Sequence, residues 1–113
     1  MPFINTKVTT TISPEQENKI RSELGKAITA IGKNENWLML DFEDNCRLHF
    51  RGNNDEPSAF IEVKLLGKAT DSAYDKMTVL VTDIIAKELS IPSERIYIKY
   101  EECDHWGWNS TNF

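Results

Sequence analysis

Two successive segments of this chain carry the same order of predicted elements, a strand, a helix and a strand. In the first segment, the apolar pattern predicts strands at residues 3–8 and 37–42 and a helix at residues 13–31. In the second segment it predicts strands at residues 60–65 and 95–101, separated by a helix that ends near Leu89. This order leaves few folds open, because the strands must share a sheet that the helices cover.

The two segments correspond to each other under a shift of 58 residues. The shift takes the helix end Ile31 to Leu89 and takes Pro2 to Phe60. It takes the strand residues and the acidic pair that follows them, Leu38, Leu40, Phe42 and Glu43-Asp44, to Ile96, Ile98, Tyr100 and Glu101-Glu102. The repeat covers approximately residues 2–44 and 60–102 of a single domain, 1–113. Two right-handed β-α-β units predict an α+β fold, a four-stranded mixed sheet with two helices on one face.

The first helix has clear start and stop signals. Ser13 is a suitable N-cap, Pro14 suits the first helical position, and Gln16 can complete a capping box. Gly32 is expected to end the helix. Between these signals the apolar residues recur at helical spacing and predict one buried stripe: Ile20, Leu24, Ala27, Ile28 and Ile31.

The strand predicted at residues 37–42 is almost entirely apolar, which is typical of a strand covered on both faces. Because the two helices cover one face of the sheet, we expect the other face to be buried between subunits. In the second segment Ile61, Val63 and Leu65 alternate with other residues and predict one buried face.

The composition excludes several classes of protein. The net charge is −5, from 18 acidic and 13 basic side chains, which argues against nucleic-acid binding because that affinity comes mainly from basic clusters. No apolar run approaches the roughly 18–20 residues that span a bilayer. Residues 1–6 do not have the pattern of a signal peptide. With only Cys46 and Cys103, we expect free thiols and a cytoplasmic location, and unconventional secretion remains open.

Four residues carry side chains that zinc prefers: Cys46, His49, Cys103 and His105. Cys46 and His49 are three apart in a possible strand, so they are expected on opposite faces, and no metal site is predicted. Asn109-Ser110-Thr111 is a glycosylation sequon that, without a signal peptide, is not expected to meet the modifying enzymes.

A further pattern consists of short motifs along nearly the whole chain: Met1-Pro2-Phe3-Ile4, Ile31-Gly32-Lys33, Glu56-Pro57-Ser58-Ala59, Leu66-Gly67-Lys68, the run from Pro92 to Ile98, and Gly107-Trp108-Asn109-Ser110-Thr111 with Phe113 close behind. In this order and at this spacing, the motifs resemble the macrophage migration inhibitory factor branch of the tautomerase superfamily. No single motif is specific by itself.

The resemblance implies a homotrimer whose three sheets enclose a channel, with an active site at each subunit interface and no cofactor. It implies that Pro2 is catalytic, that Lys33 binds an anion and that Leu66 contacts the substrate. Four aromatic residues match positions that wall the pocket from the neighbouring subunit: Tyr97, Trp106, Trp108 and Phe113.

This sequence departs from the family pattern at three places. Lys99 stands where the family has an asparagine, and its side chain is expected on the same sheet face as that of Tyr97. Residues 58–61 replace the family's Cys-x-x-Cys, so thiol–disulfide activity is not expected. Asn112 lies between Thr111 and Phe113.

A terminal proline has the chemistry that tautomerisation needs, once Met1 is removed. Moving a proton from carbon to oxygen requires a base with a pKa near the working pH. An α-amine titrates at about 7.7–8.0, and burial in an apolar pocket or a neighbouring cation such as Lys33 lowers that pKa. The alternatives remain open: Pro2 can serve only to permit Met1 removal, Lys33 can be a solvated residue after a helix, and the aromatic residues can serve as packing.

Three functions compete on these grounds. The first is keto–enol tautomerisation of small aromatic 2-oxo acids such as phenylpyruvate, with Pro2 as general base. The second is a secreted signalling or host-modulating protein that acts on a receptor. The third is another reaction of the N-terminal proline, hydration or dehalogenation of an unsaturated acid, for which Lys99 would supply a second cation.

Overall fold

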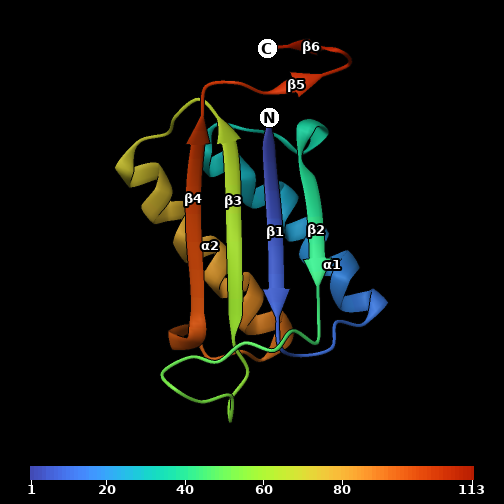
Figure 1. The fold of residues 1–113 in the computed structure, drawn as a ribbon, viewed down its shortest axis with the longest axis vertical. Helices are drawn as coiled ribbons and strands as arrows, with labels where there is room; N and C mark the ends of the chain where they lie inside the picture. Colours follow the sequence, from blue (N-terminus) through green and yellow to red (C-terminus); the bar gives the residue numbers. More distant parts are fainter.

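The computed structural model describes all residues, 1–113, as one mixed four-stranded sheet with two long helices (Figure 1). The strands lie in the order β2-β1-β3-β4. The pairs β1–β2 and β3–β4 are parallel, and the central pair β1–β3 is antiparallel. Their bounds are β1 Pro2–Val8, β2 Met39–Glu43, β3 Ala59–Leu66 and β4 Ile96–Cys103, and the helices are α1 Pro14–Ala27 and α2 Asp71–Leu89. The predicted α+β fold of two β-α-β units is confirmed.

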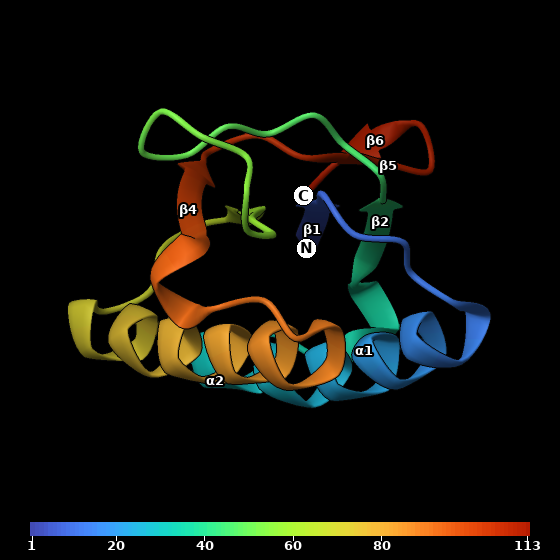
Figure 2. The same cartoon turned by 90° about the horizontal axis from the view of Figure 1, so that it is seen from below.

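Both helices cover the same face of the sheet, and the other face is open in the single chain (Figure 2). The core lies between the two layers. The apolar stripe predicted for the first helix is fully buried there, as are Ile61, Val63 and Leu65 of β3. Neither helix is long and apolar enough to span a membrane.

The predicted start and stop signals of the first helix are confirmed. The Ser13 side chain accepts a hydrogen bond from the Gln16 backbone, and the Gln16 side chain accepts one from the Ser13 backbone, which completes the capping box. After Ala27 the helix tightens into a 3-10 turn, η1 Ile28–Ile31. Gly32 then ends it with φ = 77°, a left-handed conformation that glycine adopts without steric cost.

The strand predicted at residues 37–42 is confirmed from Met39 to Phe42, but it begins two residues later than predicted, and its second face is not covered in the single chain. Trp37 belongs to a separate 3-10 turn, η2 Glu35–Trp37, and β2 begins only at Met39. Along β2, Leu40 and Phe42 pack against the core, whereas Asp41 and Glu43 are exposed on the open face. The apolar run is thus divided between a turn and an alternating edge strand, which the count of apolar residues could not reveal.

The internal repeat extends further than residues 2–44 and 60–102. The shift of 58 residues takes η2 onto a second 3-10 turn, η3 Ser93–Arg95. It also takes an isolated bridge, Phe50 with Asn53, onto the pairing of Trp108 with Thr111 between β5 Gly107–Trp108 and β6 Thr111–Asn112. The two residues inside each turn have positive φ: Arg51 and Gly52 in the first, Asn109 and Ser110 in the second.

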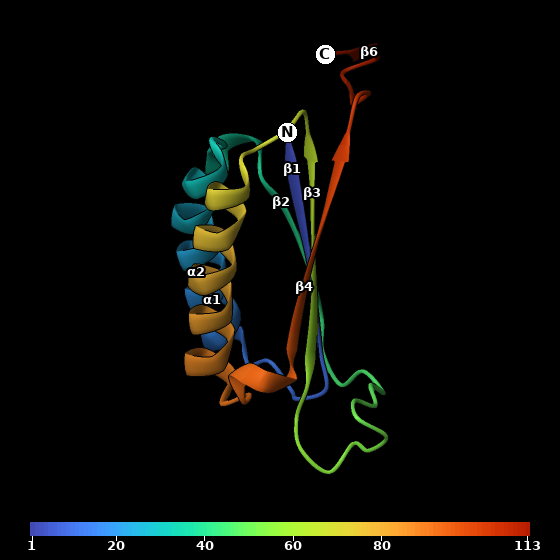
Figure 3. The same cartoon turned by 90° about the vertical axis from the view of Figure 1, so that its left-hand side faces the viewer.

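These two turns lie at opposite ends of the sheet (Figure 3). The long loop after β2 lies at one end, and the β5–β6 hairpin extends beyond the other end. Both bend toward the side away from the helices. Each turn therefore contributes side chains to a cavity at its own end of the sheet.

Candidate functional site

A cleft of about 360 Å³ lies at the end of the sheet where β1 begins. The chain start supplies one side of it, the η2 turn supplies a second, and the segment that leads into β5 supplies the third. We call it the Pro2 cleft; it is lined by Met1, Pro2, Asn36, Trp37, Leu38, Met39, Trp106, Gly107 and Trp108.

Backbone pairing fixes Pro2 beside two of the predicted site residues. Pro2 is buried and lies opposite Leu65 in the antiparallel β1–β3 pair. The next residue, Leu66, donates its backbone N–H to the Met1 carbonyl at 3.1 Å. The Lys33 ammonium donates to the Leu66 carbonyl at 2.9 Å. Pro2, Lys33 and Leu66 are therefore brought together within one chain.

The electrostatics of this end of the chain disfavour a protonated amine. Burial lowers the pKa of the Met1 amino group from its ordinary value of 8.0, and the positive charge of Lys33 lowers it further, whereas Cys103 acts weakly in the opposite direction. An amine at this position is thus more often neutral, and so able to accept a proton, than an amine in water.

Three aromatic rings form a cluster at the mouth of the Pro2 cleft. The Trp37 ring lies edge-on to the Trp108 ring at 5.1 Å and to the Phe113 ring at 5.9 Å, and Trp108 stacks on Phe113 at 5.8 Å. All three side chains remain roughly half exposed. The backbone N–H of Phe113 donates to the Trp106 carbonyl, which ties the chain end to the cleft wall.

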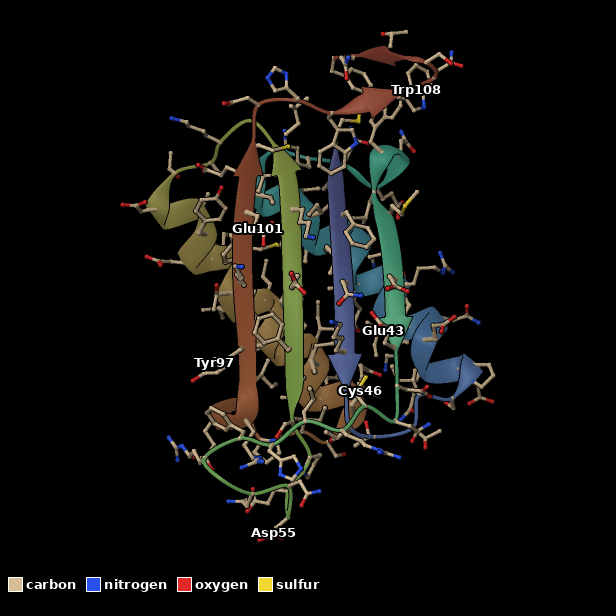
Figure 4. The ribbon with its side chains drawn as sticks, in the orientation of Figure 1. Glu43, Cys46, Asp55, Tyr97, Glu101 and Trp108 are labelled. Carbon is tan, nitrogen blue, oxygen red and sulfur yellow. The ribbon has the colours of Figure 1, made fainter.

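The chain that carries Pro2 supplies Trp106 and Trp108 to the cleft itself, and its Phe113 stacks on Trp108. A neighbouring subunit, from which the resemblance draws these residues, is not needed to bring them there. The β5–β6 hairpin extends beyond the end of the sheet where β1 begins, with Trp108 on it (Figure 4).

Tyr97 and Lys99 do not reach the Pro2 cleft of their own chain. Tyr97 lies toward the opposite end of β4 (Figure 4), with its ring edge-on to those of Phe50 and Phe60. Lys99 lies across from Glu62 on the open face, and its ammonium is 3.0 Å from the Glu101 carboxylate. The hydrogen bond to Glu101 raises the pKa of Lys99. Only a second copy of the chain could bring these two side chains to a Pro2 cleft.

The structure adds residues that the sequence patterns did not identify as part of the site, and Trp37 makes the most ring contacts among them. A local signal for the turn that carries it was present, because Asn34 precedes the turn and its side-chain oxygen accepts from the Asn36 backbone, as an N-cap does. Because residues 37–42 are almost all apolar, the sequence pattern predicted a strand at Trp37 despite this N-cap signal.

The four residues with zinc-type side chains are divided between the two ends of the sheet. The Cys46 backbone donates to Val8 at the end of β1, whereas Cys103 ends β4 beside Leu66. Both cysteines are free. Residues 44–49 form no strand, so the alternation argument used for Cys46 and His49 does not apply to them.

The whole chain, residues 1–113, matches the family model described as macrophage migration inhibitory factor (MIF). The chain belongs to the MIF family. A curated relative, the macrophage migration inhibitory factor of Xenopus laevis, is 30% identical over 95 residues, which cover 81% of this chain and 82% of the relative.

Solved structures of MIF-family proteins have the same fold. MIF2 of Leishmania major superposes with a TM-score of 0.93 at 33% identity, covering 100% of this chain and 97% of that one. The MIF homologue of Prochlorococcus marinus superposes with a TM-score of 0.88 at 31% identity, covering 98% of each chain. The predicted membership of the tautomerase superfamily is confirmed, together with its α+β fold.

Proposed function

We propose that this MIF-family chain is a keto–enol tautomerase of small aromatic 2-oxo acids, with the secondary amine of Pro2 as general base after removal of Met1. The observation that supports this most is the position of Pro2, buried at the base of a cleft beside Lys33 and the Leu66 backbone.

Removal of Met1 would change two groups at once. The Pro2 nitrogen would become an amine with a lone pair, and the Leu66 N–H would lose the Met1 carbonyl that it now binds. The Lys33 ammonium has three N–H groups, of which the Leu66 carbonyl engages one. The Leu66 N–H and Lys33 could then together hold the carboxylate of a 2-oxo acid.

With the carboxylate held there, the proton transfers follow simply. In the enol-to-keto direction, protonated Pro2 delivers its proton to the carbon next to the carbonyl, and the enol hydroxyl releases its proton to water. In the reverse direction, neutral Pro2 takes the proton from carbon and the enolate oxygen takes one from water. Burial and Lys33, which lower the pKa of the Met1 amine, would act in the same direction on the Pro2 amine.

The substrate class follows from the walls of the cleft. Trp37, Trp106 and Trp108 offer flat apolar surfaces, which suit the ring of an aromatic acid. The Lys33 ammonium at the Leu66 carbonyl suits the single carboxylate of such an acid. Lys99, paired with Glu101, offers little support for a second anionic group and thus for a hydratase or dehalogenase.

The proposal includes assembly as a homotrimer and a cytoplasmic location. Tyr97 is 58% exposed in the single chain, and the open sheet face also carries Met39 at 68% exposure. Burial of such side chains between copies would stabilise an oligomer, and it would bring Tyr97 of one copy toward the Pro2 cleft of another. Sedimentation of a stable monomer at micromolar concentration would contradict this part.

The central experiment compares protein with a free Pro2 amine, verified by intact mass, with protein that retains Met1. Phenylpyruvate tautomerisation should fall about 100-fold or more when the amine is blocked, because a general base contributes about 10²–10⁴ in rate. Equal turnover by the two forms would rule out Pro2 as base. Lys33→Gln should raise KM for phenylpyruvate, and Lys68→Gln, the same change at an exposed lysine, should not.

A second candidate, extracellular signalling, is supported by the names of the curated relatives. The same assay separates the two candidates. A correctly processed protein with no turnover of phenylpyruvate, or of other aromatic 2-oxo acids, would favour signalling over catalysis.

A further inference from the structure

The two edge strands of the sheet, β2 and β4, are equivalent segments of the internal repeat. Each pairs with only one neighbouring strand, so each has one free edge. Figure 4 shows Glu43 on β2 and Glu101 on β4, at opposite edges of the open face. The shift of 58 residues relates the open-face side chains of the two strands in pairs: Met39 to Tyr97, Asp41 to Lys99 and Glu43 to Glu101.

The middle pair, Asp41 and Lys99, combines opposite charges. Where β2 of one copy meets β4 of another copy in matching register, the Asp41 carboxylate faces the Lys99 ammonium. Where two copies of β2 meet at this position, carboxylate faces carboxylate, and two copies of β4 bring ammonium against ammonium. Like charges directly opposite each other are destabilising. The charges therefore favour a head-to-tail contact between copies, which can close into a ring, over a two-fold contact through like edges.

The acidic side of this contact is held in place by Asn5. Its side-chain nitrogen donates to the carboxylates of Asp41 and Glu43, at 2.6 Å each, so the two negative charges lie close together. No ion pair of the chain includes either carboxylate, and Lys7, the register neighbour of Glu43 on β1, is not paired with them. Asn5 is only 7% exposed, and its side-chain oxygen has no hydrogen-bond partner. The cluster is thus oriented but lacks a cation in the single chain.

The present partner of Lys99 holds it only weakly. The Lys99 ammonium lies 3.0 Å from the Glu101 carboxylate, and the two side chains are 57% and 43% exposed. An ion pair that is so open to water contributes little to stability, because water screens the charges and both side chains lose freedom. Two carboxylates held close together attract an ammonium more strongly than one does. Lys99 can therefore exchange Glu101 for the Asp41–Glu43 pair of a second copy.

We propose that Lys99 of one copy binds the Asp41–Glu43 pair of the next copy, and that this contact sets the position of Tyr97 at the next copy's Pro2 cleft. Tyr97 lies two residues before Lys99, and Met39 lies two residues before Asp41, on the same face of each strand. The register that joins Lys99 to Asp41 places Tyr97 beside Met39, which lines the Pro2 cleft. Lys99 is then a positioning residue that does not contact the substrate. This inference rests on the proposed function and its homotrimer.

The first test is subunit exchange of the full chain with a free Pro2 amine, followed by native mass spectrometry of mixed ¹⁵N-labelled and unlabelled copies. Lys99→Glu and Asp41→Lys each set like charges against one another, so each should speed exchange by about tenfold or more. The combined Asp41→Lys/Lys99→Glu chain restores opposite charges and should exchange at nearly the original rate. Lys76→Glu, the same change on α2, should have no effect. High salt should also speed exchange of the unmodified chain, because it screens the contact.

The second test separates positioning from direct substrate binding. Each single reversal, at Lys99 or at Asp41, should raise KM for phenylpyruvate severalfold with little change in kcat, and the combined chain should restore KM. A lysine that bound the substrate carboxylate could not be replaced in this way, so a KM that stays raised in the combined chain would overturn the proposal.

The outcomes also distinguish this proposal from the proposed function. Single reversals that exchange no faster than Lys76→Glu overturn the role of Lys99, and the proposed function stands if the unmodified chain still assembles and turns over phenylpyruvate. An assembled chain without turnover contradicts the tautomerase, while the exchange rates still decide the contact. An unmodified chain that is a monomer contradicts both.

Discussion

The two ends of the sheet are built from equivalent segments, but they hold their cations in different ways. At the Pro2 end the Lys33 ammonium makes one hydrogen bond, to the Leu66 carbonyl, and keeps two donors. At the other end the Arg95 guanidinium makes four hydrogen bonds and fastens the loop after β2 to the sheet. The comparison shows that one repeated architecture leaves a cation with free donors at one end and uses a cation to fasten a loop at the other.

The difference between the two cations predicts the largest effect on stability. Arg95→Met removes the donor of four hydrogen bonds that join the loop to the sheet, so the free energy of unfolding should fall by about 3 kcal/mol. Urea denaturation measures this loss. Arg47→Met, the same change at an exposed arginine, should stay within about 0.5 kcal/mol. Equal effects of the two changes would mean that Arg95 does not fasten the loop.

The aromatic cluster at the Pro2 end predicts the next effect, on substrate binding. Trp37→Ala removes two edge-on ring contacts, each worth about 0.5–1.5 kcal/mol beyond area burial, and opens the mouth of the cleft. KM for phenylpyruvate should rise about tenfold, with a smaller rise for an aliphatic 2-oxo acid. Trp37→Phe, which keeps a ring, is the matched control. An equal rise for both substrates would assign Trp37 to general packing.

The two equivalent turns predict opposite changes in stability. Gly52 has φ = 79° and its counterpart Ser110 has φ = 67°, a conformation that costs a residue with a Cβ about 1 kcal/mol. Ser110→Gly should therefore raise the free energy of unfolding by about 0.5–1 kcal/mol, and Gly52→Ser should lower it by a similar amount. Thermal or urea unfolding of both variants checks the signs, and two changes of the same sign would break the equivalence.

The smallest effect concerns pH in the chain that retains Met1. The pKa of its amine is lowered by burial and by Lys33, so between that pKa and 8.0 the unfolded chain binds more protons than the folded chain. Stability should rise slightly as pH increases through this window. Lys33→Gln should move the amine pKa back toward 8.0, as measured by NMR titration of the amine. An unchanged pKa would remove Lys33 as a cause.

Much of the fold could be predicted because its signals are local. The capping box of Ser13 and Gln16, the left-handed Gly32 and the alternation of Ile61, Val63 and Leu65 each depend on a few neighbouring residues. Reliance on the local pattern also explains why the strand predicted at residues 37–42 was started two residues too early. Apolar content alone does not distinguish a strand from a turn that supplies Trp37 to a cleft.

The candidate site was only partly accessible to sequence reasoning. The resemblance identified Pro2, Lys33 and Leu66, and the structure brings these three together. The same reasoning expected Trp106, Trp108 and Phe113 from a neighbouring subunit, because nothing in a linear pattern tells which copy of a chain a segment folds onto. In the single chain, Trp108 and Phe113 contact Trp37 of the same copy, so the chain supplies these rings to its own cleft.

The sequence by itself determined the two β-α-β units and their relation by 58 residues, since apolar periodicity, caps and breakers act over a few residues at a time. Only the tertiary structure decided which side chains the two repeated units bring into contact at each end of the sheet. Trp37 meets Trp108 and Arg95 meets Phe50 across long stretches of chain, through sheet pairing and helix packing that no local preference encodes. The charge of Arg95 without an anionic partner is likewise a property of the folded chain alone.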